Sequence, residues 1–300
     1  MAPPVLLLVF NRPEPTAQVF EQIRQARPER LYVAADGPRD DVVADKDKCA
    51  QVRKIATAVD WPCKVQTLFR AKNLGCLKGV STGIDWFFSK EECGIILEDD
   101  VVPMPAFFSF CGTMLARYRD DKQVYAVSGY NLLARKYGPA GYFRSRYFKP
   151  WGWAGWADRW QEIDITLPNF EHDHATACDA GHLKWWEKRH WRNKVSRALR
   201  KQDTWDYQWQ FFILSKGGQI IRPTANMITN VGFGPDATHT TSLGRYVMRL
   251  QENATLTNWT DREVRPGFLE DFRLFVFSFG GGPISFIKRS FFNKKTRVFG

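Results

Sequence analysis

Short apolar runs alternate with amphipathic stretches along the first 131 residues. Val5–Phe10 is a continuous apolar run that is closed by Asn11-Arg12-Pro13. From about Thr16 onward, apolar side chains recur at the spacing of one helical face, at Val19, Phe20 and Ile23. The pattern therefore predicts a buried strand followed by a helix.

The same alternation is repeated along the chain. Further strands are predicted at 31–35, 65–69, 94–97 and 124–127, with helices at about 47–59, after Gly75 and after Pro105. Strands that alternate with helices favour a mostly parallel sheet covered on both faces. The predicted fold class is α/β, with a Rossmann-like, mostly parallel sheet flanked by helices.

Polar residues follow three of the predicted strands directly. They are Asn11-Arg12, Asp36-Gly37 and Glu98-Asp99-Asp100. Open α/β sheets bind ligands at the carboxyl ends of their strands. We therefore expect these three loops to meet at one edge of the sheet and to form the site.

The composition changes sharply near residue 140. Nine tryptophans fall within about sixty residues, at positions 151, 153, 156, 160, 185, 186, 191, 205 and 209. This change predicts that 1–131 and 132–245 are two halves with different tasks, and that 246–300 is a separate basic C-terminal segment.

The segment Trp151-Gly152-Trp153-Ala154-Gly155-Trp156 has too much aromatic surface and glycine for an ordinary helix. Aromatic rings pack well against the C–H faces of sugars. Trp151, Trp153 and Trp156 are therefore candidates for substrate contact, with core packing as the alternative for most of the rings.

His172 and His174 are two positions apart, a spacing at which both side chains could ligate a metal. Their polar surroundings favour a solvated loop instead.

Length and charge limit the classes of protein to which this chain can belong. The chain has 300 residues with 44% hydrophobic content, enough for one large domain or two packed halves. No apolar stretch reaches the length of a membrane span, so a cytoplasmic protein with reduced thiols is expected. The formal net charge of +11 suits a nucleic acid, an anionic membrane or a phosphate-bearing substrate. Nucleic acid is not favoured, because no recognised motif accompanies the charge.

The basic excess is concentrated at the C-terminus. Asp271 is the last acidic residue, and 284–300 mixes lysine and arginine with phenylalanine and isoleucine. Such a mixture is typical of a helix that lies on an anionic membrane, here at the inner membrane face. A solvated tail with a few core-docking phenylalanines is the alternative.

Three consecutive acids after an apolar strand are costly, because neighbouring like charges repel unless a cation compensates them. Mn²⁺ or Mg²⁺ would compensate, since these ions take carboxylate and phosphate oxygens together. A solvated turn is the alternative for Glu98-Asp99-Asp100.

Residues 94–103 and 105–110 resemble the acidic metal motif and following helix of the N-acetylglucosaminyltransferase I family, one of the GT-A glycosyltransferases. The likeness covers roughly residues 4–242. Weaker counterparts follow in family order: residues 5–12, Asp36, residues 124–131, residues 204–209, residues 221–223 and His239.

The resemblance implies that 1–131 is a nucleotide-sugar-binding half and that 132–245 is an acceptor-binding and catalytic-base half. It also implies a role for each matching residue. Asp100 would ligate Mn²⁺, while Glu98 and Asp99 would reach hydroxyls of the ribose or the donor sugar. Asp36 would bind the base and Arg12 would help to hold the nucleotide. Asp206 would be the catalytic base, and His239 would lie in a substrate loop.

Two departures from the family limit what carries over. Asp206 is followed by Tyr207, where two acids often stand together in the family. The family's amino-terminal membrane anchor is also not seen, so the resemblance does not carry a Golgi role or a GlcNAc donor over to this chain. The enzyme expected is a hexosyl- or N-acetylhexosaminyl-transferase.

The sequence thus predicts an inverting, metal-dependent glycosyltransferase. It would move a sugar from a nucleotide donor, expected to be UDP-linked, to a saccharide or lipid-linked saccharide. One base suffices for direct displacement, whereas a retaining double displacement needs a nucleophilic carboxylate as well. A sugar nucleotidyltransferase is the first alternative, although it would normally begin with a glycine-rich phosphate loop. A saccharide-binding protein without turnover is the second.

Overall fold

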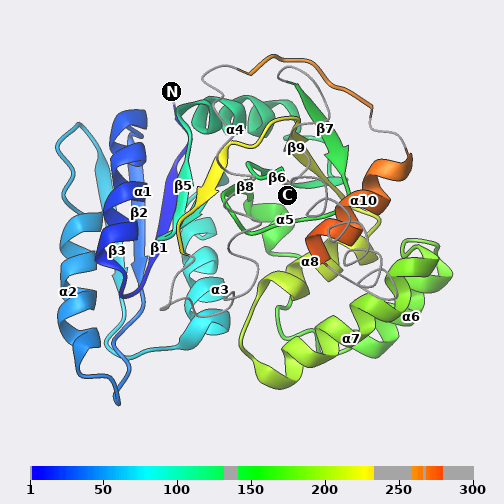
Figure 1. Ribbon diagram of the computed structural model, residues 1–300, viewed down its shortest axis with the longest axis horizontal. Coiled ribbons are helices and arrows are strands. Elements are labelled where there is room, and N and C mark those ends of the chain that lie inside the picture. The colour runs from blue at the N-terminus through cyan, green and yellow to red at the C-terminus, as the bar shows by residue number, and fades with distance from the viewer. Residues whose placement is uncertain (1, 132–140, 233–258, 266–267, 280–300) are drawn as a thin grey trace, which may run out of the picture.

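The computed structural model describes residues 2–131, 141–232, 259–265 and 268–279. Two of the predicted features, His239 and the basic segment 284–300, lie outside these residues. Within them, one large sheet with helices on both faces dominates the structure (Figure 1). The prediction of an α/β fold with a mostly parallel sheet flanked by helices is confirmed.

The large sheet has eight strands in the order β3-β2-β1-β4-β8-β6-β9-β7. Strands β8 and β7 run antiparallel to their neighbours, and the other six share one direction. The strands are β1 (Val5–Val9), β2 (Arg30–Ala35), β3 (Lys64–Phe69), β4 (Cys93–Glu98), β6 (Val124–Ser128), β7 (Tyr142–Ser145), β8 (Trp153–Trp156) and β9 (Gln219–Pro223). Because β1–β4 and β6 come from the first half and β7–β9 from the second, the two halves share one sheet.

A second, two-stranded antiparallel sheet joins β5 (Val101–Pro103) to β10 (Ile228–Asn230). It links the residues just after the acidic triplet to a segment more than a hundred positions later in the chain. The helices are α1 (Pro13–Ala26), α2 (Ala44–Ala56), α3 (Gly75–Phe88), α4 (Pro105–Arg117), α5 (Ala157–Trp160), α6 (Phe170–Asp179), α7 (Trp185–Lys201), α8 (Asp206–Ser215) and α10 (Phe268–Phe279).

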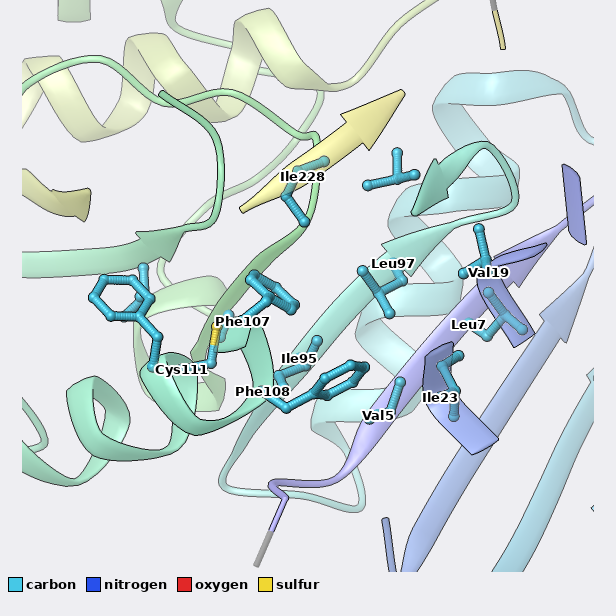
Figure 2. Close-up of a cluster of buried hydrophobic side chains, with 14 of the residues drawn as sticks. Val5, Leu7, Val19, Ile23, Ile95, Leu97, Phe107, Phe108, Cys111 and Ile228 are labelled. Carbon is cyan, nitrogen blue, oxygen red and sulfur yellow. The ribbon is translucent and has the colours of Figure 1, made fainter. Parts of the chain in front are cut away.

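The alternation of side chains along β1 explains why both faces of the sheet are covered. Val5 and Leu7 join a core with α1, α2 and α4, whereas Leu6 and Leu8 join a second core with α3 and α8. Figure 2 shows the first core, where Val5 and Leu7 face side chains from α1 and α4. Both faces of β1 are buried, so its sequence is continuously apolar instead of alternating.

Helix α1 shows how local sequence sets an element. Pro13 occupies the first turn, where its missing N–H costs nothing, and Arg27 ends the helix in the left-handed region. Val19, Phe20 and Ile23 lie on its buried face, as predicted. Burial of each such side chain contributes roughly 1.5–3 kcal/mol.

The indole of Trp153 is part of an aromatic cluster beneath the sheet. It is 1% exposed and lies 6.0 Å from the ring of Trp205 and 6.4 Å from that of Trp209, measured between ring centroids. The prediction that Trp153 contacts substrate is therefore wrong, because strand geometry turns this side chain into the core.

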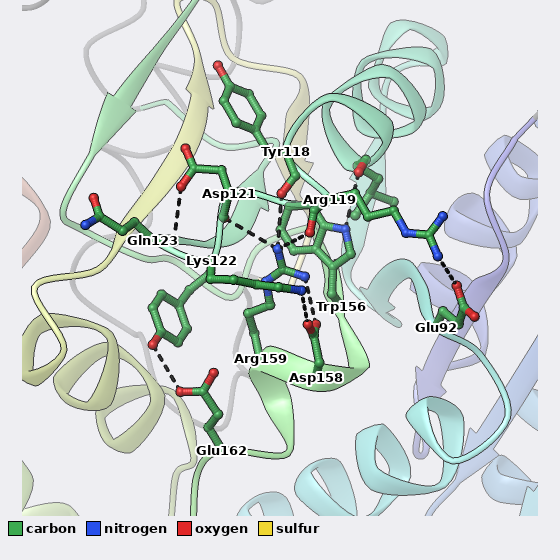
Figure 3. A network of polar contacts seen from close by, with 12 residues as sticks. Glu92, Tyr118, Arg119, Asp121, Lys122, Gln123, Trp156, Asp158, Arg159 and Glu162 are labelled. Atoms are coloured by element: carbon green, nitrogen blue, oxygen red, sulfur yellow. Dashed lines mark hydrogen bonds and ion pairs between the residues drawn. The ribbon is translucent and has the colours of Figure 1, made fainter.

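Trp156 is also a core residue, on the opposite face of β8. It is 3% exposed, and its indole N–H donates to the carbonyl of Leu115 at 3.3 Å. The buried guanidinium of Arg159 lies 4.4 Å from its ring centroid and donates to the carbonyl of Tyr118 (Figure 3). The predicted substrate role of Trp156 is wrong for the same reason.

The segment around His172 and His174 is helix α6, not the loop that its polar residues favour. His174 is 9% exposed; its Nε2 lies 2.8 Å from the carbonyl oxygen of Lys188, and its ring stacks on Phe211. Packing against α7 and α8 outweighs the weak helical propensity of this sequence.

No helix in the described part of the chain is both long and apolar enough to cross a membrane.

Candidate functional site

The carboxyl ends of β2, β1 and β4 lie side by side at one edge of the sheet. The register pairs Val9 of β1 with Ala35 of β2, and Leu8 of β1 with Glu98 of β4. The loops that begin at Phe10, Asp36 and Asp99 therefore leave the sheet at the same level. This is the edge that the sequence predicts for the site.

Arg12 joins the first loop to the acidic triplet. Its guanidinium donates to Oδ2 of Asp100 at 2.6 Å and lies 3.7 Å from Oδ1 of Asp99. These carboxylates and Glu98 raise the pKa of Arg12 against the opposing effect of burial. Arg12 is therefore a fixed positive charge within the acidic triplet.

Asp99 is buried, with 5% of its surface exposed. Its Oδ2 accepts a hydrogen bond from the backbone N–H of Phe10 at 3.2 Å. Burial raises the pKa of this carboxyl to about 7, although the nearby Arg12 opposes the shift. Asp99 ties the ends of β4 and β1 together, and its charge state changes near neutral pH.

Glu98 is the first acid of the triplet and lies near Asp206 from the second half of the chain. Burial raises the pKa of Glu98 well above its usual range, and the charges of Asp100, Asp99 and Asp206 raise it further. No hydrogen-bond partner for its carboxylate is found among the described residues. The contribution of Asp206 places the start of α8 near Glu98.

Cys76, in the first turn of α3, lies near Glu98 and Asp206. Although this residue is exposed, the pKa of its thiol is raised to about 12, first by desolvation and then by Glu98 and Asp206. The N-terminus of α3 thus borders the space between Glu98 and Asp206.

Asp206 is the first residue of α8. The hydroxyl of Thr204 donates a hydrogen bond to its Oδ1, and the carbonyl of Thr204 accepts one from the side-chain amide of Gln208 at 2.8 Å. The preceding residue, Trp205, is 1% exposed and anchors the start of the helix in the core. Asp206 is therefore held at a rigid point, with Oδ2 left for another contact.

Asp36 caps helix α3 with its side chain. Its carboxylate accepts hydrogen bonds from the backbone N–H groups of Gly37, Leu74 and Gly75 at 2.9–3.2 Å. Burial raises the pKa of Asp36, and the backbone N–H groups oppose that shift. This capping role was not predicted from the sequence.

Trp151 is the one member of the predicted tryptophan trio at the site edge. Trp153 pairs with Ile96 and Ser128, so the chain just before it lies beyond the carboxyl ends of β4 and β6. The half-buried ring of Trp151 packs edge to face on Tyr130, with centroids 4.7 Å apart.

The small β5–β10 sheet supports Asp100 from behind. The backbone N–H of Val231 donates to the carbonyl of Asp100 at 2.8 Å. A Cβ on Gly232 would lie 2.0 Å from Oδ2 of Asp100 and 2.9 Å from the guanidinium of Arg12. A larger residue here would force the ion pair between Arg12 and Asp100 to shift.

The acidic triplet could hold a hard divalent cation only if water and substrate supplied most of the ligands. In the described ranges, no three His, Cys, Asp or Glu side chains converge as a metal site. Mg²⁺ and related ions often take one or two carboxylates and complete their shell with water and substrate phosphate. Asp100, whose Oδ2 accepts a hydrogen bond from Arg12, would supply one such carboxylate through its other oxygen.

Two cavities lie away from this edge. One of about 370 Å³ is lined by Glu21, Arg24, Gln25, Arg27, Asp60 and Trp61. Another of about 260 Å³ is lined by Arg146, Tyr147, Lys184, Trp186 and Asp271. Neither lining includes a predicted site residue.

Sequence reasoning missed Thr204, Gly232 and Cys76. Cys76 directly follows Gly75, after which the sequence predicts a helix, so its place at this edge could have been inferred. Nothing in the sequence around Gly232 indicates its contact with Asp100, because that contact spans more than a hundred residues.

No protein-family model and no curated protein sequence matches the chain. Among solved structures, it is similar to HddC from Yersinia pseudotuberculosis, with 8% identity, a TM-score of 0.31 and coverage of 54% of this chain and 80% of that one. It is also similar to mouse xyloside xylosyltransferase 1, with 11% identity, a TM-score of 0.35 and coverage of 70% and 80%. Likenesses this slight carry no argument about function.

Proposed function

We propose that the protein is an inverting glycosyltransferase. It moves a sugar from a nucleoside diphosphate donor, UDP-linked by expectation, to a saccharide or lipid-linked saccharide. One observation carries the proposal: the carboxyl ends of β1, β2 and β4 bring Asp36, Arg12 and the acidic triplet to one edge, where Arg12 contacts Asp100. The contribution of Asp206 to the raised pKa of Glu98 adds an acid from the second half to this edge.

The donor would lie along the edge from Asp36 to the triplet. Asp36 would contact the base, sharing oxygens that already accept backbone hydrogen bonds at the start of α3. Glu98 and Asp99 would accept hydrogen bonds from hydroxyls of the ribose or sugar. Trp151 would offer an aromatic face to the donor or acceptor.

Asp206 would act as the general base. The acceptor hydroxyl gives its proton to this carboxylate as its oxygen bonds to the anomeric carbon, and the bond from that carbon to the diphosphate breaks. Attack from the face opposite the leaving group inverts the anomeric configuration. The hydrogen bond from Thr204 fixes the carboxylate for this step.

Arg12 would place positive charge near the departing diphosphate, where negative charge develops. Mn²⁺ or Mg²⁺, held by Asp100, would supply Lewis-acid neutralisation of the same charge when bound. The acidic excess at this edge supports the presence of a cation beyond Arg12.

A panel of nucleotide sugars, each with and without Mn²⁺, tests the proposal by thermal unfolding and by release of nucleoside diphosphate. We expect one donor to stabilise the protein only with the metal, by about 2.7 kcal/mol at a hundredfold excess over Kd. That donor should also be hydrolysed slowly. Stabilisation by free saccharides alone, with no response to any nucleotide sugar, would favour the non-catalytic saccharide-binding alternative.

A further inference from the structure

Helix α7 carries a surface that the proposed reaction does not use. Its 17 residues include seven lysines or arginines and one acid, Glu187. That acid is fully buried and pairs with Arg146 at 3.0 Å. The solvent-facing side of α7 is therefore strongly basic.

The two sides of α7 separate cleanly along its axis. Glu187, Trp191, Val195 and Ala198 are all buried and recur at helical spacing, with Trp191 and Val195 packed in the core beneath α6 and α8. The opposite line consists of Trp185, Arg189, Arg192, Ser196 and Arg200, spaced by four, three, four and four residues. Figure 1 shows α7 at the periphery of the molecule, beside α6.

Few of these cations are neutralised by the protein itself. Across the described residues, α7 cations form ion pairs only at Arg192, with Glu171 at 2.9 Å, and at Lys201, with Asp203 at 3.6 Å. Both pairs are exposed and therefore weak. Arg189, Arg197 and Arg200 are exposed and have no ion-pair partner in that part of the chain.

Trp185 lies at the start of the same outer line. It is 80% exposed, although a tryptophan normally buries much of its area. An indole beside cationic side chains suits the headgroup region of a membrane, where the ring enters the apolar boundary and the cations meet phosphate. The convex face of one helix offers no groove for a polymer strand.

We propose that the α7 face, defined as Trp185, Arg189, Arg192, Arg197 and Arg200, docks the protein on an anionic lipid surface. The helix would lie parallel to the membrane along its length of about 25 Å. This site differs from segment 284–300, for which the sequence predicts a separate membrane contact. It also does not depend on the reaction that the acidic edge performs.

The test measures binding of the full-length chain to vesicles of phosphatidylcholine, with and without one third phosphatidylglycerol, in about 0.1 M salt. The variant Arg189→Gln/Arg197→Gln/Arg200→Gln should bind anionic vesicles about a hundredfold more weakly, at roughly fivefold for each cation. The matched control, Lys46→Gln/Lys48→Gln/Lys54→Gln, removes three exposed charges from α2 and should retain more of the affinity. Both variants keep the same C-terminal segment.

A second variant examines the tryptophan. Trp185→Ala should reduce affinity for the anionic vesicles and remove part of the fluorescence quenching by brominated lipid. Far-ultraviolet circular dichroism should match wild type, because the side chain is exposed. Equal losses in the α7 and α2 variants, no loss in the α7 variant, or tighter binding to a soluble polyanion than to vesicles would overturn the proposal.

Discussion

At the residue scale, the site depends on carboxylates whose charge is costly to keep. Asp99 is buried beside Arg12, and Glu98 lies among three other acids with one arginine to balance them. When the pKa of a carboxyl group is higher in the folded than in the unfolded protein, ionisation of that group lowers the free energy of unfolding. The site therefore retains charge at the expense of stability, as binding sites often do.

Asp99→Asn should separate this cost from the rest of the pH response. The pKa of Asp99 is raised to about 7, so between about pH 4 and 7 the folded state holds a proton that the unfolded state has lost. The wild-type free energy of unfolding should therefore fall as pH rises through this window. Relative to wild type, Asp99→Asn should gain on the order of 2 kcal/mol between pH 5 and 8.

Urea unfolding of both proteins without metal, at pH 5 and pH 8, gives this difference directly. The asparagine can still accept a hydrogen bond from the N–H of Phe10 through its side-chain oxygen. A difference between the two proteins that does not change with pH would contradict the raised pKa.

Asp36 links a predicted binding role to an observed structural one. Asp36→Ala removes the acceptor for three backbone N–H groups and should lower the free energy of unfolding by about 1–2 kcal/mol. Asp36→Asn keeps one acceptor oxygen and should lose less. Urea unfolding measures both losses, and an alanine variant as stable as wild type would show that the cap contributes nothing.

At the scale of elements, the helices and strands of the first half could be predicted from the pattern of apolar residues, and those of the second half could not. The apolar run of β1 and the helical face of α1 follow directly from sequence, because each element is buried in one simple way. Strand β8 is short, rich in tryptophan and reversed relative to its neighbours, so no periodicity marks it. Helix α6 was missed because tertiary packing holds a polar sequence in helical form.

Trp153 on β8 and Trp151 just before it differ in how much each contributes to the stability of the fold. Trp153→Ala should lower the free energy of unfolding by about 3–5 kcal/mol, because it opens a cavity in the aromatic cluster around Trp205. Trp151→Ala should lose much less stability, since its ring is half-buried at the edge. Chemical unfolding compares the two, and equal losses would contradict the assignment of Trp153 to the core and Trp151 to the edge.

At the scale of the whole molecule, the central sheet brings distant residues to one edge. The sequence predicted that Arg12, Asp36 and the acidic triplet would meet, because parallel strands present their carboxyl ends together. It gave no geometric reason for Asp206 to join them about a hundred residues later, and only family resemblance pointed there. The contact of Gly232 with Asp100 lay beyond sequence reasoning, since it depends on the pairing of β10 with β5.

The central claim is that Asp206 and Asp100 perform different tasks in one site. The direct test is sugar transfer by Asp206→Asn, with binding of the metal and nucleotide measured on the same sample. We predict unchanged binding and a loss of transfer of about 10²–10⁴-fold, because the acceptor loses its base. Asp100→Asn should instead lose metal-dependent nucleotide binding, and Asp203→Asn, a neighbouring acid, should retain transfer. Full transfer by Asp206→Asn would contradict the account.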